Sequence, residues 1–329
     1  MQSVVSFVGV DVGSREFVVA RHGHPEIATF ENTDKGMKTL IRYLKKKSKG
    51  RIRVLLESTG NYGLDLAMAL HDEKRTEPIY INPRTTSAFA KAGALRAKTD
   101  KVDAQFLAML CANGHGEGWS PPPFIALQLR GATRRIRAMV TTSTKEKNRL
   151  KALQATNTSP DFVIQDIERS IQFWQDSVDE MRAKALALAF TDDHIRRKIE
   201  LLTSIPGVAS ATALELVAEI LCLPSDLSAR QLVACAGLDP KPRQSGKRDS
   251  PRRISKMGSP YLRMILHMAA LNSVRCCPAV KQRHEALVAR GKRPLVAYVA
   301  ISRKLLHCVH GMLKTGTTFE PEKFSGLPR

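Results

Sequence analysis

The sequence predicts a mixed α/β domain followed by a largely helical remainder. Short β-branched runs alternate with helix-like stretches only before about residue 120. Glycines and a triple proline then interrupt the chain, and beyond them apolar residues recur at spacings of three and four. We therefore expect an α/β domain over residues 1–120, a helical coiled-coil segment over 121–192 and a mainly helical domain over 193–329.

The first domain contains three predicted strands and two predicted helices. The strands are the apolar runs Val4 to Val10, Glu16 to Ala20 and Arg51 to Leu56. The helices are the stretches Met37 to Lys46 and Gly63 to His71. The break that ends the domain consists of Gly114, Gly116, Gly118 and Pro121-Pro122-Pro123.

The middle segment carries two apolar seams on consecutive helices. The stronger seam is Ile164, Ile167, Ile171, Trp174, Val178, Met181, Ala185 and Leu188. The weaker one is Ile125, Leu129, Ala132, Ile136 and Met139, and Asn157 to Pro160 supplies a turn between the helices. The seams pair either with each other as a hairpin or with a second subunit as a coiled coil, and both alternatives remain open.

Two helical patterns flank Ile205-Pro206-Gly207-Val208 in the last segment. This arrangement resembles the helix-hairpin-helix, whose turn offers backbone N–H groups to a nucleic-acid phosphate, and Gly207 is therefore a candidate binding residue. Ala209 replaces the second glycine of that motif, and an ordinary helical connection remains an equal alternative. A stretch rich in proline, glycine and basic residues follows, before a helix from Tyr261 to Ser273.

The composition favours a polyanionic partner. The formal net charge is +21 and the isoelectric point is near 10.0. No apolar run reaches the roughly 18 residues of a membrane span, and the N-terminus lacks a signal-peptide pattern, so we expect a cytoplasmic protein. We expect the six scattered cysteines to be reduced, buried thiols, and His307 and His310 to be ordinary histidines rather than metal ligands. Aromatic residues make up 5% of the chain, which argues against base stacking of single strands.

One predicted helix lacks acidic residues. No Asp or Glu occurs from Pro121 to Lys145, whereas a solvated helix face usually mixes charges of both signs. We therefore expect a phosphate-facing surface there. Its candidate residues are Arg130, Arg134, Arg135 and Arg137.

Four carboxylates stand out in this basic chain. Asp11 and Glu57 end two apolar strands, and Asp100 and Asp103 share one face of a helix that begins at Thr99 or Asp100. Converging carboxylates repel one another unless a divalent cation neutralises them, which favours Mg²⁺ or Mn²⁺ and phosphoryl transfer. Two alternatives remain open: Asp100 as a helix N-cap, and Asp11 in a sugar-kinase type of phosphate loop, although no second glycine-rich phosphate loop follows.

The chain resembles the DEDD insertion-sequence transposases, a family of bridge-RNA-guided recombinases, in a series of ordered blocks. The blocks are VGVDVGS, LLESTGNY, INP and LRAKTDKVDA, followed by SIPGV, CAGLDP, QSG and RISKMG. The likeness spans nearly the whole chain. Two small departures are Cys235-Ala236, where an aromatic residue commonly precedes alanine, and Ser14.

The resemblance implies an RNase H-like, RuvC-like first domain that binds metal through Asp11, Glu57, Asp100 and Asp103. It also implies a catalytic serine, Ser245, that attacks a DNA phosphodiester and forms a 5′-phosphoserine intermediate. Ser250, Ser255 and Ser259 compete with Ser245 if the residues are considered without the resemblance. Candidate nucleic-acid contacts around Ser245 are Lys241, Arg243, Lys247, Arg248, Arg252, Arg253 and Lys256.

The implied partners are donor and target duplex DNA and a noncoding bridge RNA with a loop for each. The implied assembly is a homotetramer, joined in part by a coiled coil, with active sites shared between protomers and an association with the bacterial nucleoid. The principal alternative is a metal-dependent nuclease resembling Holliday-junction resolvases, in which water replaces the serine. A non-catalytic nucleic-acid scaffold would bind in a salt-sensitive manner without breaking strands.

Overall fold

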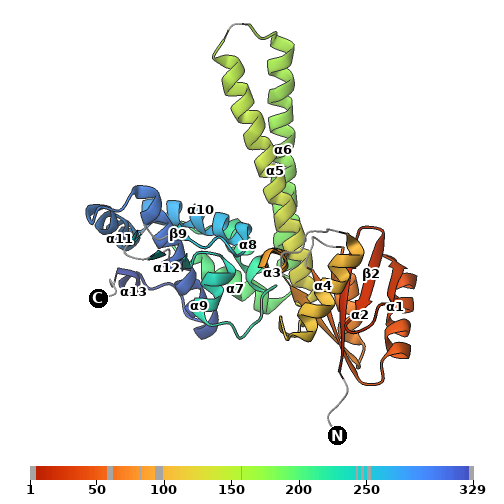
Figure 1. Ribbon diagram of the computed structural model, residues 1–329. Coiled ribbons are helices and arrows are strands. Elements are labelled where there is room, and N and C mark those ends of the chain that lie inside the picture. Colours follow the sequence, from red (N-terminus) through yellow and green to blue (C-terminus); the bar gives the residue numbers. More distant parts are fainter. Residues whose placement is uncertain are drawn as a thin grey trace. The chain divides into compact units, whose positions relative to one another are not determined.

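The computed structural model describes residues 5–57, 62–81, 83–92, 99–156, 158–241, 244–245, 248–249 and 253–325. The chain divides into two compact units, Met1–Pro121 and Pro122–Arg329, which we describe separately (Figure 1). The first is a mixed α/β unit and the second is mostly helical, as the sequence predicts. No helix in the described part of the chain has the length and apolar character needed to cross a bilayer.

The first unit is built on a five-stranded sheet in the order β3-β2-β1-β4-β5. The strands are β1 (Val5–Val12), β2 (Glu16–Arg21), β3 (Ile27–Glu31), β4 (Arg51–Glu57) and β5 (Thr76–Ile81). β1, β2 and β3 are antiparallel neighbours, whereas β1, β4 and β5 run parallel. The carboxyl ends of β1 and β4, two inner strands, therefore lie side by side at the same end of the sheet.

Helices cover both faces of this sheet (Figure 1). The helices α1 (Asp34–Lys47) and α2 (Leu64–Asp72) pack on the face that includes Val8, Val10 and Val54. The helix α4 (Asp100–Ala112) packs on the opposite face together with α3 (Pro83–Ala92). The two faces follow from the alternation of side chains along each strand.

The second unit begins with two long helices, α5 (Phe124–Gln154) and α6 (Asp161–Ala189), that pack against each other (Figure 1). Of the two seams, Leu129, Ile136 and Val178 belong to one continuous buried core. The seams therefore form a hairpin within the chain, which selects one of the two arrangements left open by the sequence. Asn157 of the predicted turn lies outside the described residues.

The remaining helices of the second unit surround that core. They are α7 (Asp193–Thr203), α8 (Ser210–Ile220), α9 (Ala229–Cys235), α10 (Pro260–Cys276), α11 (Pro278–Ala289), α12 (Pro294–Thr315) and α13 (Pro321–Ser325). The stretch between α9 and α10, expected to be a loop, contains two short antiparallel ladders. One pairs β6 (Pro240–Lys241) with β9 (Arg253–Ile254), and the other pairs β7 (Gln244–Ser245) with β8 (Arg248–Asp249).

Gly207 occupies the turn between α7 and α8 with a φ of 89°. A Cβ atom there would lie 2.6 Å from the carbonyl carbon of Asn272 in α10. Close packing against α10 therefore requires glycine at this position, and the predicted contact of Gly207 with a nucleic-acid phosphate stays a prediction. All six cysteines are free, and five are buried or partly buried, but Cys276 is exposed, contrary to the expectation of buried thiols.

Candidate functional site

Asp11 and Glu57 project from the same face of neighbouring parallel strands. Val10 and Leu56 are paired in the register of β1 and β4 and face α1 and α2. Because side chains alternate along a strand, the next residues, Asp11 and Glu57, face the side covered by α3 and α4. Two carboxylates predicted from the sequence thus lie at one sheet edge, beneath the same pair of helices.

Gly9 brings the start of α4 to these carboxylates. A Cβ atom at Gly9 would lie 2.2 Å from the carbonyl oxygen of Ala104, so the backbone of α4 rests directly on β1. Asp100 and Asp103 lie in the first turn of α4, just before this contact. Thr99 is the N-cap, because its side chain accepts a 3.4 Å hydrogen bond from the backbone N–H of Val102. The alternative that assigns the N-cap to Asp100 is therefore wrong.

The electrostatics of Asp11 show that the four acids influence one another. Burial raises the pKa of Asp11, and the charges of Asp100, Asp103 and Glu57 raise it further, to about 6. A hydrogen bond from the backbone of Val12 opposes this shift only in part. A carboxylate that is held near three others is destabilised in its charged form, and a bound cation would relieve that repulsion.

The four carboxylates suit a hard divalent cation, although they lie further apart than the ligands of a fully enclosed metal site. Within the described residues, no three His, Cys, Asp or Glu side chains converge at metal-binding distance. Mg²⁺ prefers carboxylate oxygens and retains several water molecules, so one or two direct carboxylate ligands are sufficient. On this chemistry, the residues that would hold the ion are Asp11, Glu57, Asp100 and Asp103.

Thr86 orients Glu57, a role that sequence reasoning missed. Thr86 is buried on α3, and its hydroxyl lies within hydrogen-bonding distance of both Glu57 Oε1 and the carbonyl oxygen of Pro83, the latter at 2.9 Å. A bond to the carboxylate fixes one oxygen of Glu57 and leaves the other for a ligand. Thr86 lies three residues after Pro83, the last residue of the INP block, but that spacing gives no signal of the contact with Glu57.

Ser245 lies in the short β7–β8 hairpin of the second unit. Its backbone pairs with that of Arg248, and Gln244 pairs with Asp249. Three cations predicted around the serine, Arg243, Lys247 and Arg252, lie outside the described residues. Lys241 and Arg253 face each other in the adjoining β6–β9 ladder, and both are exposed. Lys256, also exposed, adopts a φ of 56° in the segment that follows.

Residues 235–241 and 253–258, which flank this hairpin in the sequence, form a compact stem that supports it. A Cβ atom at Gly258 would lie 2.0 Å from the carbonyl oxygen of Cys235, so the segment before α10 packs directly on the end of α9. Arg263 links the end of α9 to the segment before α10, because its Nη1 donates 2.9 Å hydrogen bonds to the carbonyl oxygens of Ala236 and Gly258. The CAGLDP and RISKMG blocks therefore form one local structure.

Two serines that compete with Ser245 make structural hydrogen bonds. Ser255 donates a 2.5 Å hydrogen bond to Asp239 within the stem. Ser259 is the N-cap of α10, where its hydroxyl accepts a 3.3 Å hydrogen bond from the backbone of Leu262. Ser250 lies outside the described residues. These hydrogen bonds give the hydroxyls of Ser255 and Ser259 structural roles, so neither hydroxyl needs a catalytic role to account for its presence.

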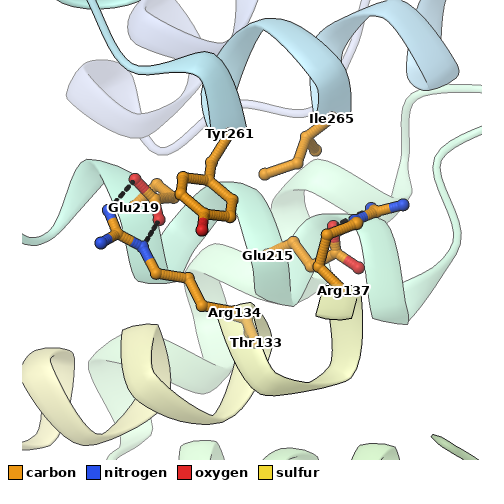
Figure 2. A pocket seen from close by; sticks show the side chains of 7 residues that line it. All are labelled: Thr133, Arg134, Arg137, Glu215, Glu219, Tyr261 and Ile265. Atoms are coloured by element: carbon orange, nitrogen blue, oxygen red, sulfur yellow. Dashed lines mark hydrogen bonds and ion pairs between the residues drawn. The ribbon is translucent and has the colours of Figure 1, made fainter. Parts of the chain in front are cut away.

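The four arginines expected to face phosphates are divided by the structure. Arg134 forms a bidentate ion pair with Glu219 at 2.7 and 3.2 Å, and Arg137 pairs with Glu215 (Figure 2). Both glutamates are buried on α8, so these two arginines serve the packing of α5 on α8. Arg135 is exposed and Arg130 is half-buried, and these two remain candidates for phosphate contacts.

The ion-pair cluster also reaches α10. The guanidinium of Arg134 lies 4.5 Å from the ring centroid of Tyr261 (Figure 2). Ser259 Oγ lies 3.4 Å from Glu219. Burial lowers the pKa of Arg134, but the hydrogen bond and charge of Glu219 raise it by more. Burial raises the pKa of Glu215 despite the opposing charge of Arg137. Helices α5, α8 and α10 are thus joined beside the stem of the Ser245 hairpin.

Two models of transposase families match the chain. One, described as a transposase of the DEDD type of IS110, matches residues 8–156 and includes all four acids. The other, described as the transposase IS116/IS110/IS902 family, matches residues 199–285 and includes Ser245. Together the two matches cover about seven tenths of the chain.

Known relatives extend this likeness over nearly the full length. The pilin gene-inverting protein of Moraxella bovis is 26% identical over 324 residues, which cover 96% of this chain and 98% of the relative. The protein of the same name from Moraxella lacunata is similar to the same extent. A 43.6 kDa protein of insertion element IS110 from Streptomyces coelicolor is 28% identical over 126 residues, or 38% of this chain and 31% of its own length.

Proposed function

Since the chain belongs to the IS110 family of insertion-sequence transposases, whose activity is DNA cleavage and rejoining, we propose that it is an RNA-guided recombinase with Ser245 as its nucleophile. The likeness to proteins named for the inversion of pilin genes supports rearrangement of duplex DNA as the reaction class. The strand order β3-β2-β1-β4-β5 is consistent with an RNase H-like first unit.

The mutual influence of the four acids carries this proposal. Asp11 is held near Glu57, Asp100 and Asp103, which raise its pKa to about 6 together with burial. Such repulsion is costly in a domain without a counter-ion, and it is useful where a metal ion must be bound. Mg²⁺ or Mn²⁺ held by these acids would stabilise negative charge on a phosphate and on the entering and leaving oxygens.

Ser245 would supply the entering oxygen. Its hydroxyl oxygen forms a bond to the phosphorus of a DNA strand, and the bond from phosphorus to the 3′ oxygen breaks. The leaving 3′ oxygen takes up a proton, and the serine proton passes to solvent or to a neighbouring base. The product is a 5′-phosphoserine ester and a free 3′ hydroxyl.

The ester conserves the energy of the phosphodiester. A 3′ hydroxyl of a second duplex then attacks the phosphoserine and releases Ser245, so strand exchange needs no nucleotide cofactor. Exposed Lys241 and Arg253 in the stem are suited to bind phosphates that flank the reacting one. The hydrogen bonds of Ser255 and Ser259 support Ser245 as the nucleophile, because they account for two of its competitors.

Guide RNA and a tetrameric assembly complete the proposal. Recognition of the donor and target would depend on pairing with RNA, because few aromatic side chains are available for reading bases. The exposed rings of Phe162 and Phe173 on α6 support contacts between protomers along the helical hairpin. The shared active sites of this proposal would form between such protomers.

Strand cleavage by acid-to-amide variants tests the metal site. Asp103→Asn should abolish Mg²⁺-dependent cleavage of a duplex carrying a donor site, whereas Asp72→Asn, an exposed residue at the end of α2, should leave it unchanged. Cleavage by Asp103→Asn at the wild-type rate would mean that the acid is structural. Cleavage that yields hydrolysed ends and no protein adduct would favour the resolvase-like nuclease.

Copurification tests the guide. The protein should retain a discrete noncoding RNA through purification, and that RNA should direct joining of two matching DNAs in the presence of Mg²⁺. The matched control is the same reaction with both loops of the RNA scrambled. Equal joining with the scrambled RNA would contradict guidance by RNA.

A further inference from the structure

The outer face of α12 carries cations without acids. We define the α12 basic face as Ala300, Arg303, Lys304, His307, Gly311 and Lys314, which share one side of the helix at helical spacing. The opposite side is buried in the core through Ile301, Leu305 and Met312. Ala300 and Lys314 are exposed, and Arg303 and Lys304 are half-buried. The face is thus turned away from the core of the unit.

Acidic residues are missing from this whole region of the chain. No Asp or Glu occurs in residues 286–319, which contain Arg290, Lys292, Arg293, Arg303, Lys304 and Lys314. By contrast, α6 is a solvated helix in which Arg169, Arg182 and Lys184 each pair with an acid three or four residues away. Solubility alone therefore does not explain a face on which every charged side chain is positive.

Like charges meet at this face. Burial lowers the pKa of His307, and the neighbouring charges of Arg303, Lys304, His310 and Arg230 lower it further. Arg230 belongs to α9, which packs against α12. His310 is turned toward the connection between α8 and α9, where its Nε2 lies 2.8 Å from the carbonyl oxygen of Leu227. Cations on two helices are therefore held together without an ion pair to any described acid.

We propose that the α12 basic face, with Arg230, binds the phosphate backbone of duplex DNA. Lys314 lies eleven residues beyond Arg303, which corresponds to about 16 Å along a helix and spans several phosphates. A Cβ atom at Gly311 would meet nothing within 4 Å, so a DNA backbone has room to approach there. No Phe, Tyr or Trp side chain belongs to this face, which favours a double helix over stacked single strands.

This inference rests on the proposed function, because it names a second contact for the DNA that the enzyme would process. The contact is independent of sequence, since it involves phosphates rather than base edges. Its role is to hold the duplex while Ser245 reacts with one strand.

Binding of a duplex of arbitrary sequence, measured by fluorescence anisotropy in EDTA over a range of KCl concentrations, tests the inference on the full chain. The triple variant Arg303→Gln, Lys304→Gln and Lys314→Gln should show a weaker salt dependence. The magnitude of the slope of log affinity against log salt should fall by about 3, since each lost phosphate contact removes roughly 0.9. Affinity at about 0.1 M KCl should fall about tenfold or more.

The matched control removes the same charge from α6 through Arg169→Gln, Arg182→Gln and Lys184→Gln, and it should change the slope by less than about 1. Equal slopes for the two triple variants would overturn the inference. Weaker binding of a structured RNA, with duplex DNA binding unchanged, would overturn it as well.

A single gain-of-charge variant keeps the test valid if the triple variant fails to fold. Ala300→Lys adds a cation to the α12 basic face and should steepen the slope by about 1, and an unchanged slope would contradict the inference. No cleavage occurs in this assay. If the α12 variants change the salt dependence of binding as expected but the wild-type protein forms no covalent adduct with DNA, the proposed chemistry is refuted and the α12 contact is not.

Discussion

Replacing Asp11 with Asn should stabilise the metal-free protein at neutral pH. The pKa of Asp11 rises from 3.8 to about 6 in the fold, so the native state binds this proton more tightly than the unfolded state does. Raising the pH from about 4 to 6 therefore favours unfolding, and the cost remains constant above that range. Asn carries no charge and avoids this cost.

The size of the effect follows from the pKa shift. A rise of the pKa from 3.8 to about 6 corresponds to about 3 kcal/mol, which is an upper bound. Because the side chain of Asp11 is only half-buried, water screens part of the repulsion, and a gain of about 1 to 2 kcal/mol is expected for Asp11→Asn at about pH 7.5. About a third of that gain should remain at about pH 4.5.

Urea unfolding monitored by the fluorescence of Trp119 measures this gain. The chain has two tryptophans, so a Trp174→Phe background leaves Trp119, which packs against the core of the first unit, as the single reporter. In EDTA, Asp11→Asn should unfold at higher urea than its parent, and Asp72→Asn should not. Added Mg²⁺ should stabilise the parent and have little effect on Asp11→Asn. Equal stability of the parent and Asp11→Asn at both pH values would refute the reasoning.

Three further substitutions test the packing that supports the site. Gly9→Ala places a Cβ atom 2.2 Å from the backbone of α4, so it should cost about 1 to 3 kcal/mol and reduce Mg²⁺-dependent cleavage more than duplex binding; wild-type cleavage would contradict the role of this contact. Arg134→Met leaves Glu219 buried and unpaired and should lower the free energy of unfolding by about 2 to 4 kcal/mol, whereas adding Glu219→Gln should recover most of that loss; an equally unstable double variant would argue against the ion pair. Gly258→Ala should abolish strand cleavage but preserve duplex binding, because a Cβ atom would collide with Cys235 in the stem, and Gly131→Ala, which meets nothing within 4 Å, should cleave normally.

Local patterns predicted the parts of the fold that depend on neighbouring residues. The apolar runs of β1, β2 and β4 and the seam along α6 are visible in the sequence because burial repeats at fixed spacing. The strand β5 was missed because Glu77 and Pro78 interrupt its apolar pattern, and proline is tolerated there at the sheet edge. The strand β3, at the other edge, is too exposed to show a strong pattern.

Contacts between distant segments were beyond the reach of the sequence. Arg134 and Arg137 looked like a phosphate-binding face because their partners, Glu219 and Glu215, lie about eighty residues further along the chain. Gly207 has a packing role through its close approach to α10, which the sequence did not reveal, and its contact with a nucleic acid stays a prediction. The bond from Thr86 to Glu57 likewise depends on how α3 crosses the sheet.

The four acids were predictable as a group because strand ends and a helix start are readable from sequence, and their shared edge follows from the pairing of β1 with β4. The prediction that they bind metal remains a proposal. The assignment of Ser245 as the nucleophile likewise remains a proposal.

Mass spectrometry of the protein, purified together with its RNA and then allowed to react with a donor duplex, tests the central claim most directly. With Mg²⁺ present, the peptide containing Ser245 should carry a 5′-phosphate-linked nucleotide, and this adduct should vanish in Ser245→Ala and in Asp11→Asn. An adduct that persists in Ser245→Ala, or that maps to a different residue, would contradict the account.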